Sequence, residues 1–259
     1  MPTVTSQDGT TIYYEAAGSG DPVVLVHGIT ESGRNWDPIT ERLSGSHRVV
    51  VPDLRGHGRS GEGPTYALAD LAGDVGAVIV AEGLDRPRLV GHSLGGAVVS
   101  ALAGSFPARS VVNVDQPLKL DEFQAQLQAV APALRDPDSF PMVIAGLFDQ
   151  LAGDALADEE RERIEGNRRA SQEVVLGIWM PILESPAEEV AAMVEAAVSA
   201  IACPYLAIHG IDPGSGYVDW LTGLVPTAAV EVWDGLGHYP HLVDPDRFVA
   251  RLAEFWSTD

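Results

Sequence analysis

The sequence predicts an α/β protein with a mostly parallel, doubly wound sheet and one helical insertion. Short apolar, β-branched runs alternate with helical patterns along most of the chain, as expected when helices cover both faces of a parallel sheet. Between residues 116 and 186 the strand signal disappears and helical patterns remain. A chain of 259 residues is long enough for one large domain carrying such an insertion.

The predicted strands differ in how deeply they are buried. Asp8-Gly9 is a hairpin signal between the alternating segments 3–7 and 10–16. Strands that are buried on both faces have continuous apolar runs rather than alternating ones. Runs of this kind occur at 22–26, 48–51, 88–90, 111–114 and 205–208, and a last strand is predicted at 230–233.

Helical patterns fall into two groups. Those expected to flank the sheet lie at 35–44, 66–82, 94–105, 187–200 and 245–256, and those of the insertion lie at 123–130, 140–151, 159–169 and 173–183. Since the insertion follows the sixth strand, it is expected to form a cap over the carboxyl ends of the strands, where ligands bind in open α/β folds. We therefore expect a core of residues 1–115 and 187–259 and a helical cap of residues 116–186.

Charge and composition exclude several classes of partner. The formal net charge is −21, from 37 Asp and Glu residues against 16 Lys and Arg residues, so nucleic acid and anionic membranes are repelled. Cys203 is the single cysteine, which rules out an internal disulfide. The N-terminus resembles no signal peptide, and no apolar stretch reaches the roughly 18–20 residues that span a bilayer. We expect a cytoplasmic protein with no nucleic-acid or membrane partner.

The stretch Gly91-His92-Ser93-Leu94-Gly95 lies where an apolar strand ends and an alanine-rich helix begins. Glycines without a Cβ allow the strand and the helix to approach closely at such a turn. The turn exposes the serine hydroxyl above the sheet, with the positive end of the helix behind it. The pattern predicts Ser93 as a nucleophile. A phosphate-binding loop is disfavoured because the Gly-Lys-Ser/Thr ending is absent.

A serine at its ordinary pKa needs a base, and the loop after the last strand supplies one. His238 lies in that loop, which returns to the sheet edge that carries Ser93. His241 begins the approach to a helix and is expected to pack there. His92 cannot share the direction of the adjacent Ser93 in a tight turn. His238 is therefore the predicted base.

Acyl transfer also requires donors for the oxyanion. His27-Gly28 directly follows the first core strand, which places the Ile29 amide at the same sheet edge. The Ile29 N–H and the Leu94 N–H, the latter from the residue after the nucleophile, are the predicted oxyanion donors.

Four motifs in this order resemble the α/β-hydrolase superfamily: His27-Gly28, the segment 52–60 (PDLRGHGRS), the segment 91–96 (GHSLGG) and Gly237-His238. The resemblance implies the α/β-hydrolase fold and an acyl-enzyme mechanism, with Ser93 as nucleophile and His238 as base. In this superfamily the segment 52–60 is usually a structural loop. A serine at the elbow argues against the dehalogenases and epoxide hydrolases of this fold, which need an aspartate there.

The acid of the triad has two candidates. Most of the superfamily places it after the strand at 205–209, where Asp212 follows Gly210 by two residues rather than the usual three. Asp115, at the end of the preceding strand, matches the position used by some lipases and by haloalkane dehalogenases. The resemblance favours Asp115, with Asp212 as the alternative. Either carboxylate would orient the imidazole and stabilise its charged form.

The predicted function is that of a serine hydrolase acting on a small hydrophobic ester or lactone, without cofactor or metal. Carbon–carbon bond hydrolysis, cofactor-free perhydrolysis, or a ligand receptor with little turnover are the alternatives. Gly28, Trp36, Phe148 and Trp179 are the candidate substrate-binding residues, because apolar side chains of the cap are expected to wall the pocket.

Overall fold

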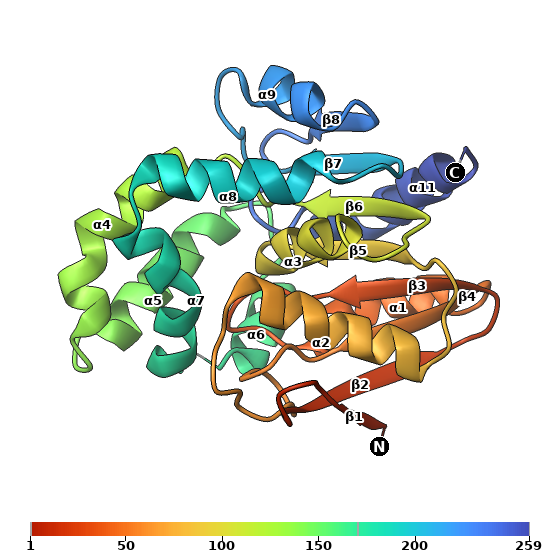
Figure 1. The fold of residues 1–259 in the computed structure, drawn as a ribbon, viewed down its shortest axis with the longest axis horizontal. Coiled ribbons are helices and arrows are strands. Elements are labelled where there is room, and N and C mark those ends of the chain that lie inside the picture. The colour runs from red at the N-terminus through yellow and green to blue at the C-terminus, as the bar shows by residue number, and fades with distance from the viewer. Residues whose placement is uncertain (1, 170, 259) are drawn as a thin grey trace.

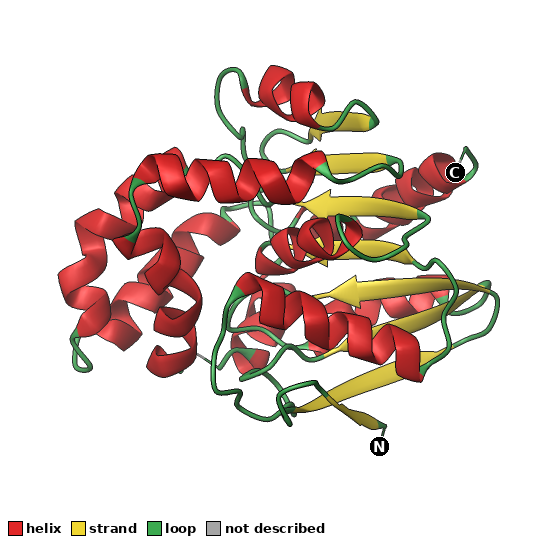
Figure 2. Cartoon of the chain, in the orientation of Figure 1, coloured by secondary structure: helices red, strands yellow, loops and turns green. Residues whose placement is uncertain are grey.

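The apolar runs of the sequence form one twisted sheet in the computed structural model, which describes residues 2–169 and 171–258. The strands within those residues are β1 (Thr3–Thr5), β2 (Thr11–Ala17), β3 (Asp21–Val26), β4 (His47–Pro52), β5 (Arg88–His92), β6 (Ser110–Val114), β7 (Tyr205–His209) and β8 (Ala228–Val232). Their spatial order is β1-β2-β4-β3-β5-β6-β7-β8. The two pairs that include β2 are antiparallel and the remaining pairs are parallel (Figure 2).

Helices cover both faces of this sheet, which explains why every residue of β5, β6 and β7 is buried. On one face, α2 (Leu68–Ala81), α3 (Leu94–Ala103) and α9 (Tyr217–Leu224) bury an apolar core against the strands. On the other face, α1 (Asp37–Leu43) and α11 (Pro245–Trp256) form a second core (Figure 1). The predicted α/β-hydrolase fold class is confirmed.

The segment between β6 and β7 is helical. It forms α4 (Asp121–Arg135), α5 (Phe140–Ala152), α6 (Asp158–Asn167), α7 (Gln172–Glu184) and α8 (Ala187–Ser199). The arrowheads of the parallel strands in Figure 1 point toward α4, α5 and α7. Helix α8 contacts α4 and α7 of this segment and also α3 and α9, which pack on the sheet. The predicted boundary at residues 186 and 187 thus falls just before a helix that joins the cap helices to the core.

Two helical features differ from the sequence prediction. Helix α4 was expected to end before Pro132, yet it continues to Arg135, because Ala131 and Leu134 are buried in the cap core and offset the lost backbone hydrogen bond. The short helix α9 was not predicted. In the described residues no helix has both the length and the apolar character that crossing a membrane requires.

Candidate active site

Ser93 occupies the turn between β5 and α3 in a backbone conformation that non-glycine residues rarely adopt, with φ 52° and ψ −125°. The neighbouring glycines make this turn possible. A Cβ on Gly91 would lie 2.1 Å from the carbonyl oxygen of Gly95, and a Cβ on Gly95 would lie 2.2 Å from that of Val26. The geometry is that of a nucleophile elbow, with the serine held at the start of a helix.

The structure brings Asp115 and His238 together. His238 Nδ1 donates to Asp115 Oδ2 at 2.6 Å, and Asp115 Oδ1 accepts from the amides of Gly210 at 2.8 Å and Ile211 at 3.1 Å. Burial alone would raise the pKa of Asp115, but the hydrogen bond and charge of His238 hold that pKa below its ordinary value. Asp115 also has a positive φ, 52°, at the end of β6.

Asp212 lies apart from this pair. Its carboxylate accepts from the amide of Gly214 at 2.9 Å within its own exposed loop. The Gly210-Ile211 segment that precedes it contributes backbone donors to Asp115 instead of a carboxylate to His238. Of the two acid candidates, only Asp115 is hydrogen-bonded to the predicted base in the described structure.

Two hydrogen bonds to the backbone of His238 hold the loop that carries this residue. The His238 amide donates to the carbonyl of Leu151 in α5 at 2.9 Å, and the carbonyl of His238 accepts from His92 Nε2 at 2.8 Å. The two imidazole rings lie 4.6 Å apart, centroid to centroid. His241 lies in α10 (Pro240–Val243) and packs on Trp36, and its burial lowers the pKa of its imidazole well below the ordinary value.

The turn after β3, residues 27–31, presents the predicted oxyanion donor Ile29. The carbonyl of Gly28 accepts from His27 Nδ1 at 2.7 Å and from the Glu31 amide at 3.3 Å. Because the peptide unit is planar and trans, a fixed Gly28 carbonyl directs the Ile29 N–H to the opposite side. Thr30, with φ 65°, then bends the chain back.

Leu94 N–H is one of the amides at the helix start that lack an intrahelical acceptor. Across residues 2–169 and 171–258, neither the Leu94 nor the Ile29 amide donates to a protein acceptor. Both residues also contribute side chains to the apolar cluster of the cap. The two amides thus stay available beside a water-poor surface, which suits stabilisation of a developing negative charge.

The predicted pocket residues divide into two groups. Phe148 and Trp179 are buried in the cap cluster together with Ile29, while Gly28 lies against the carboxylate of Glu31, which a Cβ would approach to 3.1 Å. Trp36 instead packs in the core between the sheet and α11, 1% exposed. Its assignment to the pocket wall is therefore corrected, because the helical turn that begins at Gly33 directs its ring inward.

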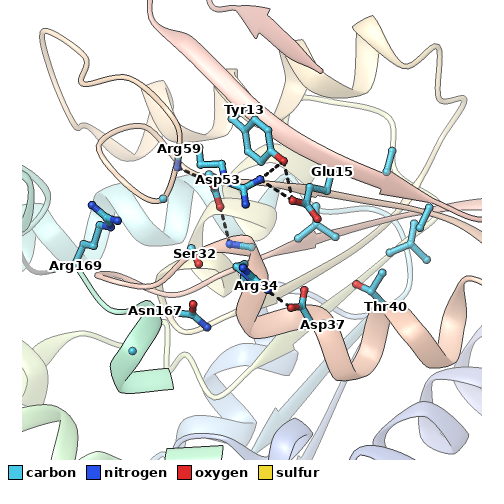
Figure 3. A pocket seen from close by; sticks show the side chains of 17 residues that line it. Tyr13, Glu15, Ser32, Arg34, Asp37, Thr40, Asp53, Arg59, Asn167 and Arg169 are labelled. Carbon is cyan, nitrogen blue, oxygen red and sulfur yellow. Dashed lines mark hydrogen bonds and ion pairs between the residues drawn. The ribbon is translucent and has the colours of Figure 1, made fainter. Parts of the chain in front are cut away.

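The segment 52–60 forms a tight loop, and its Leu54 amide donates to His27 Nε2 at 3.0 Å. Asp53 accepts from the amides of Gly33 at 2.7 Å and Arg59 at 2.8 Å, as Figure 3 shows. Arg55 is buried in a bidentate pair with Asp74. A cavity of about 260 Å³ opens between this loop, β2, the start of α1 and the C-terminal end of α6 (Figure 3). Its lining contains none of the triad candidates. In the described part of the chain, no group of three His, Cys, Asp or Glu side chains could hold a metal ion.

Residues 23–251 match the model of the alpha/beta hydrolase family. The chain belongs to the alpha/beta hydrolase family. This alpha/beta hydrolase is 28% identical to a protein named non-heme haloperoxidase from Rhodococcus erythropolis, over 98% of this chain and 99% of that relative. An esterase from Exiguobacterium antarcticum has the same fold, with a TM-score of 0.82, 19% identity and 98% of each chain covered.

Another solved structure, Est816, is described as an N-acyl homoserine lactone degrading enzyme. It matches this alpha/beta hydrolase with a TM-score of 0.73 and 26% identity, over 98% of this chain and 100% of that one. Membership of the family supports hydrolase activity as the general function of the chain.

Sequence reasoning missed a buried polar cluster at the turn of residues 27–31, called the oxyanion turn below because it carries the predicted donor Ile29. It consists of Glu31, His92, Tyr239 and Arg168. The available signal was an acidic residue three positions after Gly28 in a loop that leaves a buried strand, since a carboxylate at that depth needs buried partners.

Proposed function

We propose that this hydrolase cleaves a carboxylic ester or lactone through an acyl-enzyme intermediate on Ser93. The observation that carries the proposal is the 2.6 Å hydrogen bond between His238 Nδ1 and Asp115. A neutral imidazole that donates from Nδ1 has its lone pair on Nε2, so it is in the tautomer that a general base requires.

In the proposed reaction His238 Nε2 takes the proton of the Ser93 hydroxyl while Oγ attacks the substrate carbonyl. The negative charge on the carbonyl oxygen is stabilised by the amides of Ile29 and Leu94. The protonated His238 then gives its proton to the departing alkoxide, and the acyl group stays on Ser93. A water molecule, deprotonated by His238, attacks this ester, and release of the acid restores the serine hydroxyl.

The proposed substrate is small and hydrophobic. Phe148 and Trp179 supply aromatic surface in the cluster that also contains Ile29 and Leu94. The net charge of −21 disfavours anionic substrates. The similarity to an N-acyl homoserine lactone degrading enzyme supports a lactone, and the similarity to an esterase by fold is compatible with an open-chain ester.

Cofactor-free perhydrolysis is a second candidate, favoured by the similarity to a protein named non-heme haloperoxidase. The acyl-enzyme would be the same, and hydrogen peroxide would replace water as the second nucleophile to release a peracid. The ratio of acid to peracid formed from one ester in the presence of peroxide separates the two outcomes.

The test is turnover of p-nitrophenyl esters and lactones of graded chain length by the wild type and by Ser93→Ala. We expect multiple turnovers, inactivation by a fluorophosphonate that adds one adduct at Ser93, and loss of activity in the folded Ser93→Ala variant. Activity retained by Ser93→Ala would exclude the proposed nucleophile. A single turnover in the wild type would favour a ligand receptor over an esterase.

A further inference from the structure

Glu31 is a carboxylate with 1% exposure directly beneath the oxyanion turn, and the proposed reaction gives it no role. Its Oε2 accepts from the amide of Gly28 at 3.0 Å and lies 3.4 Å from His92 Nδ1. Its Oε1 accepts from the hydroxyl of Tyr239 at 2.9 Å. One side chain therefore contacts the turn, the nucleophile elbow and the loop of the base.

His92 extends this connection to the base itself. One ring nitrogen, Nε2, faces the carbonyl oxygen of His238 at 2.8 Å, and the other, Nδ1, faces the Glu31 carboxylate. The carbonyl oxygen of His238 can only accept, so Nε2 is the donor of that contact. A continuous path of polar contacts thus runs from the Gly28 amide through Glu31 and His92 to the backbone of His238.

The charge of Glu31 is balanced within the protein. Burial alone would raise the pKa of Glu31, but the charge and hydrogen bond of His92, together with the charge of Arg168, hold it well below the ordinary value. Arg168 follows α6, and its guanidinium donates to Thr30 Oγ1 at 3.1 Å and to the Tyr239 hydroxyl at 3.4 Å. An ionised carboxylate fits this site because each of its oxygens has a donor.

A buried ion pair is weak support for stability, because desolvation of the two charges offsets most of their attraction. The contribution of these buried charges here is to orient the backbone groups around Gly28 and His238. The Glu31 carboxylate holds the N–H of the His27–Gly28 peptide. The Glu31 amide and His27 Nδ1 hold the carbonyl of the next peptide, Gly28–Ile29, which carries the Ile29 N–H. His92 fixes the carbonyl of His238 in the same way.

We propose that Glu31 and His92 are positioning residues that keep the oxyanion turn and the loop of the base aligned with Ser93. This inference rests on the proposed function. The aligned groups act on charge that appears only in the transition state, so their loss should lower kcat and leave KM nearly unchanged.

The experiment compares Glu31→Gln with the wild type. Glutamine has the same shape but no charge, so the attraction to His92 and Arg168 is lost. Its NH₂ group also replaces one of the two acceptor oxygens, which face Tyr239 on one side and Gly28 and His92 on the other. We expect kcat per active site for p-nitrophenyl butyrate to fall about 10–100-fold, somewhat less than the effect of deleting an oxyanion donor. Glu165→Gln is the matched control, because Glu165 lies 3.7 Å from Arg168 on the exposed side and should leave kcat unchanged.

Inhibition by an alkyl trifluoromethyl ketone separates positioning from a general structural effect. The ketone forms a tetrahedral adduct with Ser93 whose oxyanion needs the aligned amides. The inhibition constant of the ketone should rise in Glu31→Gln by the same factor as kcat/KM falls. Because Glu31 and His92 act through one network, the kcat of the double variant Glu31→Gln/His92→Gln should be no lower than that of the less active single variant. A kcat within threefold of the wild type, an unchanged inhibition constant, or additive losses would overturn the inference.

Fluorophosphonate labelling distinguishes a failure of the positioning role from a failure of the proposed function. If the wild type is labelled at Ser93 while Glu31→Gln keeps its kcat, only the positioning role fails; an unlabelled wild type removes the proposed function itself. If Glu31→Gln does not fold, Tyr239→Phe carries the test. It removes the hydrogen bond to Oε1 and should lower kcat about 3–10-fold, the size expected for one ordinary hydrogen bond. The inhibition constant of the ketone should rise by the same factor. An unchanged kcat in that variant would refute the role.

Discussion

Replacement of Asp115 by Asn is the most direct test of the proposed triad. The Asn side chain can keep the acceptor that faces the amides of Gly210 and Ile211, but its NH₂ group then replaces the oxygen that faces His238 Nδ1. Two donors cannot share that contact, so the imidazole proton moves to Nε2. An Nε2 that carries a proton cannot accept one from Ser93.

The expected loss follows from the charge that is removed. With the imidazolium centre about 4 Å from the carboxylate, a unit pair at an effective dielectric constant of about 20 is worth roughly 4 kcal/mol. That energy corresponds to a decrease in kcat of about 10³-fold, and the wrong tautomer extends the expectation to about 10⁴-fold. The decrease in kcat is measured from initial rates on p-nitrophenyl butyrate, normalised by active-site titration.

Asp212→Asn is the matched control, because in the described structure the Asp212 carboxylate accepts from the Gly214 amide of its own exposed loop. We expect its kcat to stay within about threefold of the wild type, as for a surface substitution. An Asp115→Asn enzyme that keeps a tenth or more of its activity, or an equal loss in the two variants, would refute the assignment of the acid.

Three further outcomes are expected. In Gly95→Ala the new Cβ meets a backbone carbonyl at 2.2 Å, so the free energy of unfolding in urea should fall by about 3 kcal/mol; an unchanged midpoint would contradict the close approach of strand and helix. The pKa of the His57 imidazole is lowered to about 3 by burial, so the unfolded chain binds more protons below pH 6.5 and stability falls as the pH decreases from there. His57→Gln should therefore reduce the loss of stability between pH 7 and pH 5 by about 2 kcal/mol, and an identical loss in both proteins would show that His57 does not stay neutral. Trp179→Ala should raise KM for octanoate esters more than for acetate esters, and equal changes would place the acyl chain away from the cap cluster.

Local patterns in the sequence predicted most elements of the sheet, and the resemblance to a known family added the fold class. Continuous β-branched runs predicted β3, β5, β6 and β7, because strands covered on both faces have no polar side to interrupt the pattern. Helix α9 was missed because its eight residues include a glycine and follow a loop rich in turn residues. The course of α4 through Pro132 depends on tertiary packing in the cap, which no local propensity reveals.

The candidate site was predictable only as far as it depends on local turns. The glycines around Ser93 predict the elbow, because the strand and the helix approach too closely there for a Cβ. This requirement is local and does not depend on the rest of the fold. The choice between Asp115 and Asp212 depends on which carboxylate reaches His238 across the sheet edge, a distance that sequence spacing does not encode. The buried Glu31 was overlooked, and Trp36 was misplaced, because burial on one face or the other of a loop is decided by its three-dimensional neighbours.

The positive φ of Ser93 has a consequence for engineering. A non-glycine residue in this region costs about 1 kcal/mol or more relative to glycine, so the elbow is a place where the fold is less stable than it could be. Ser93→Gly should melt at a higher temperature than the wild type while lacking the hydroxyl. The strain at Ser93 fits the proposed role of its hydroxyl, because a glycine would be the less strained choice at this position. If Ser93 is the nucleophile as proposed, the same substitution yields a more stable, inactive protein in which an intact substrate could be trapped.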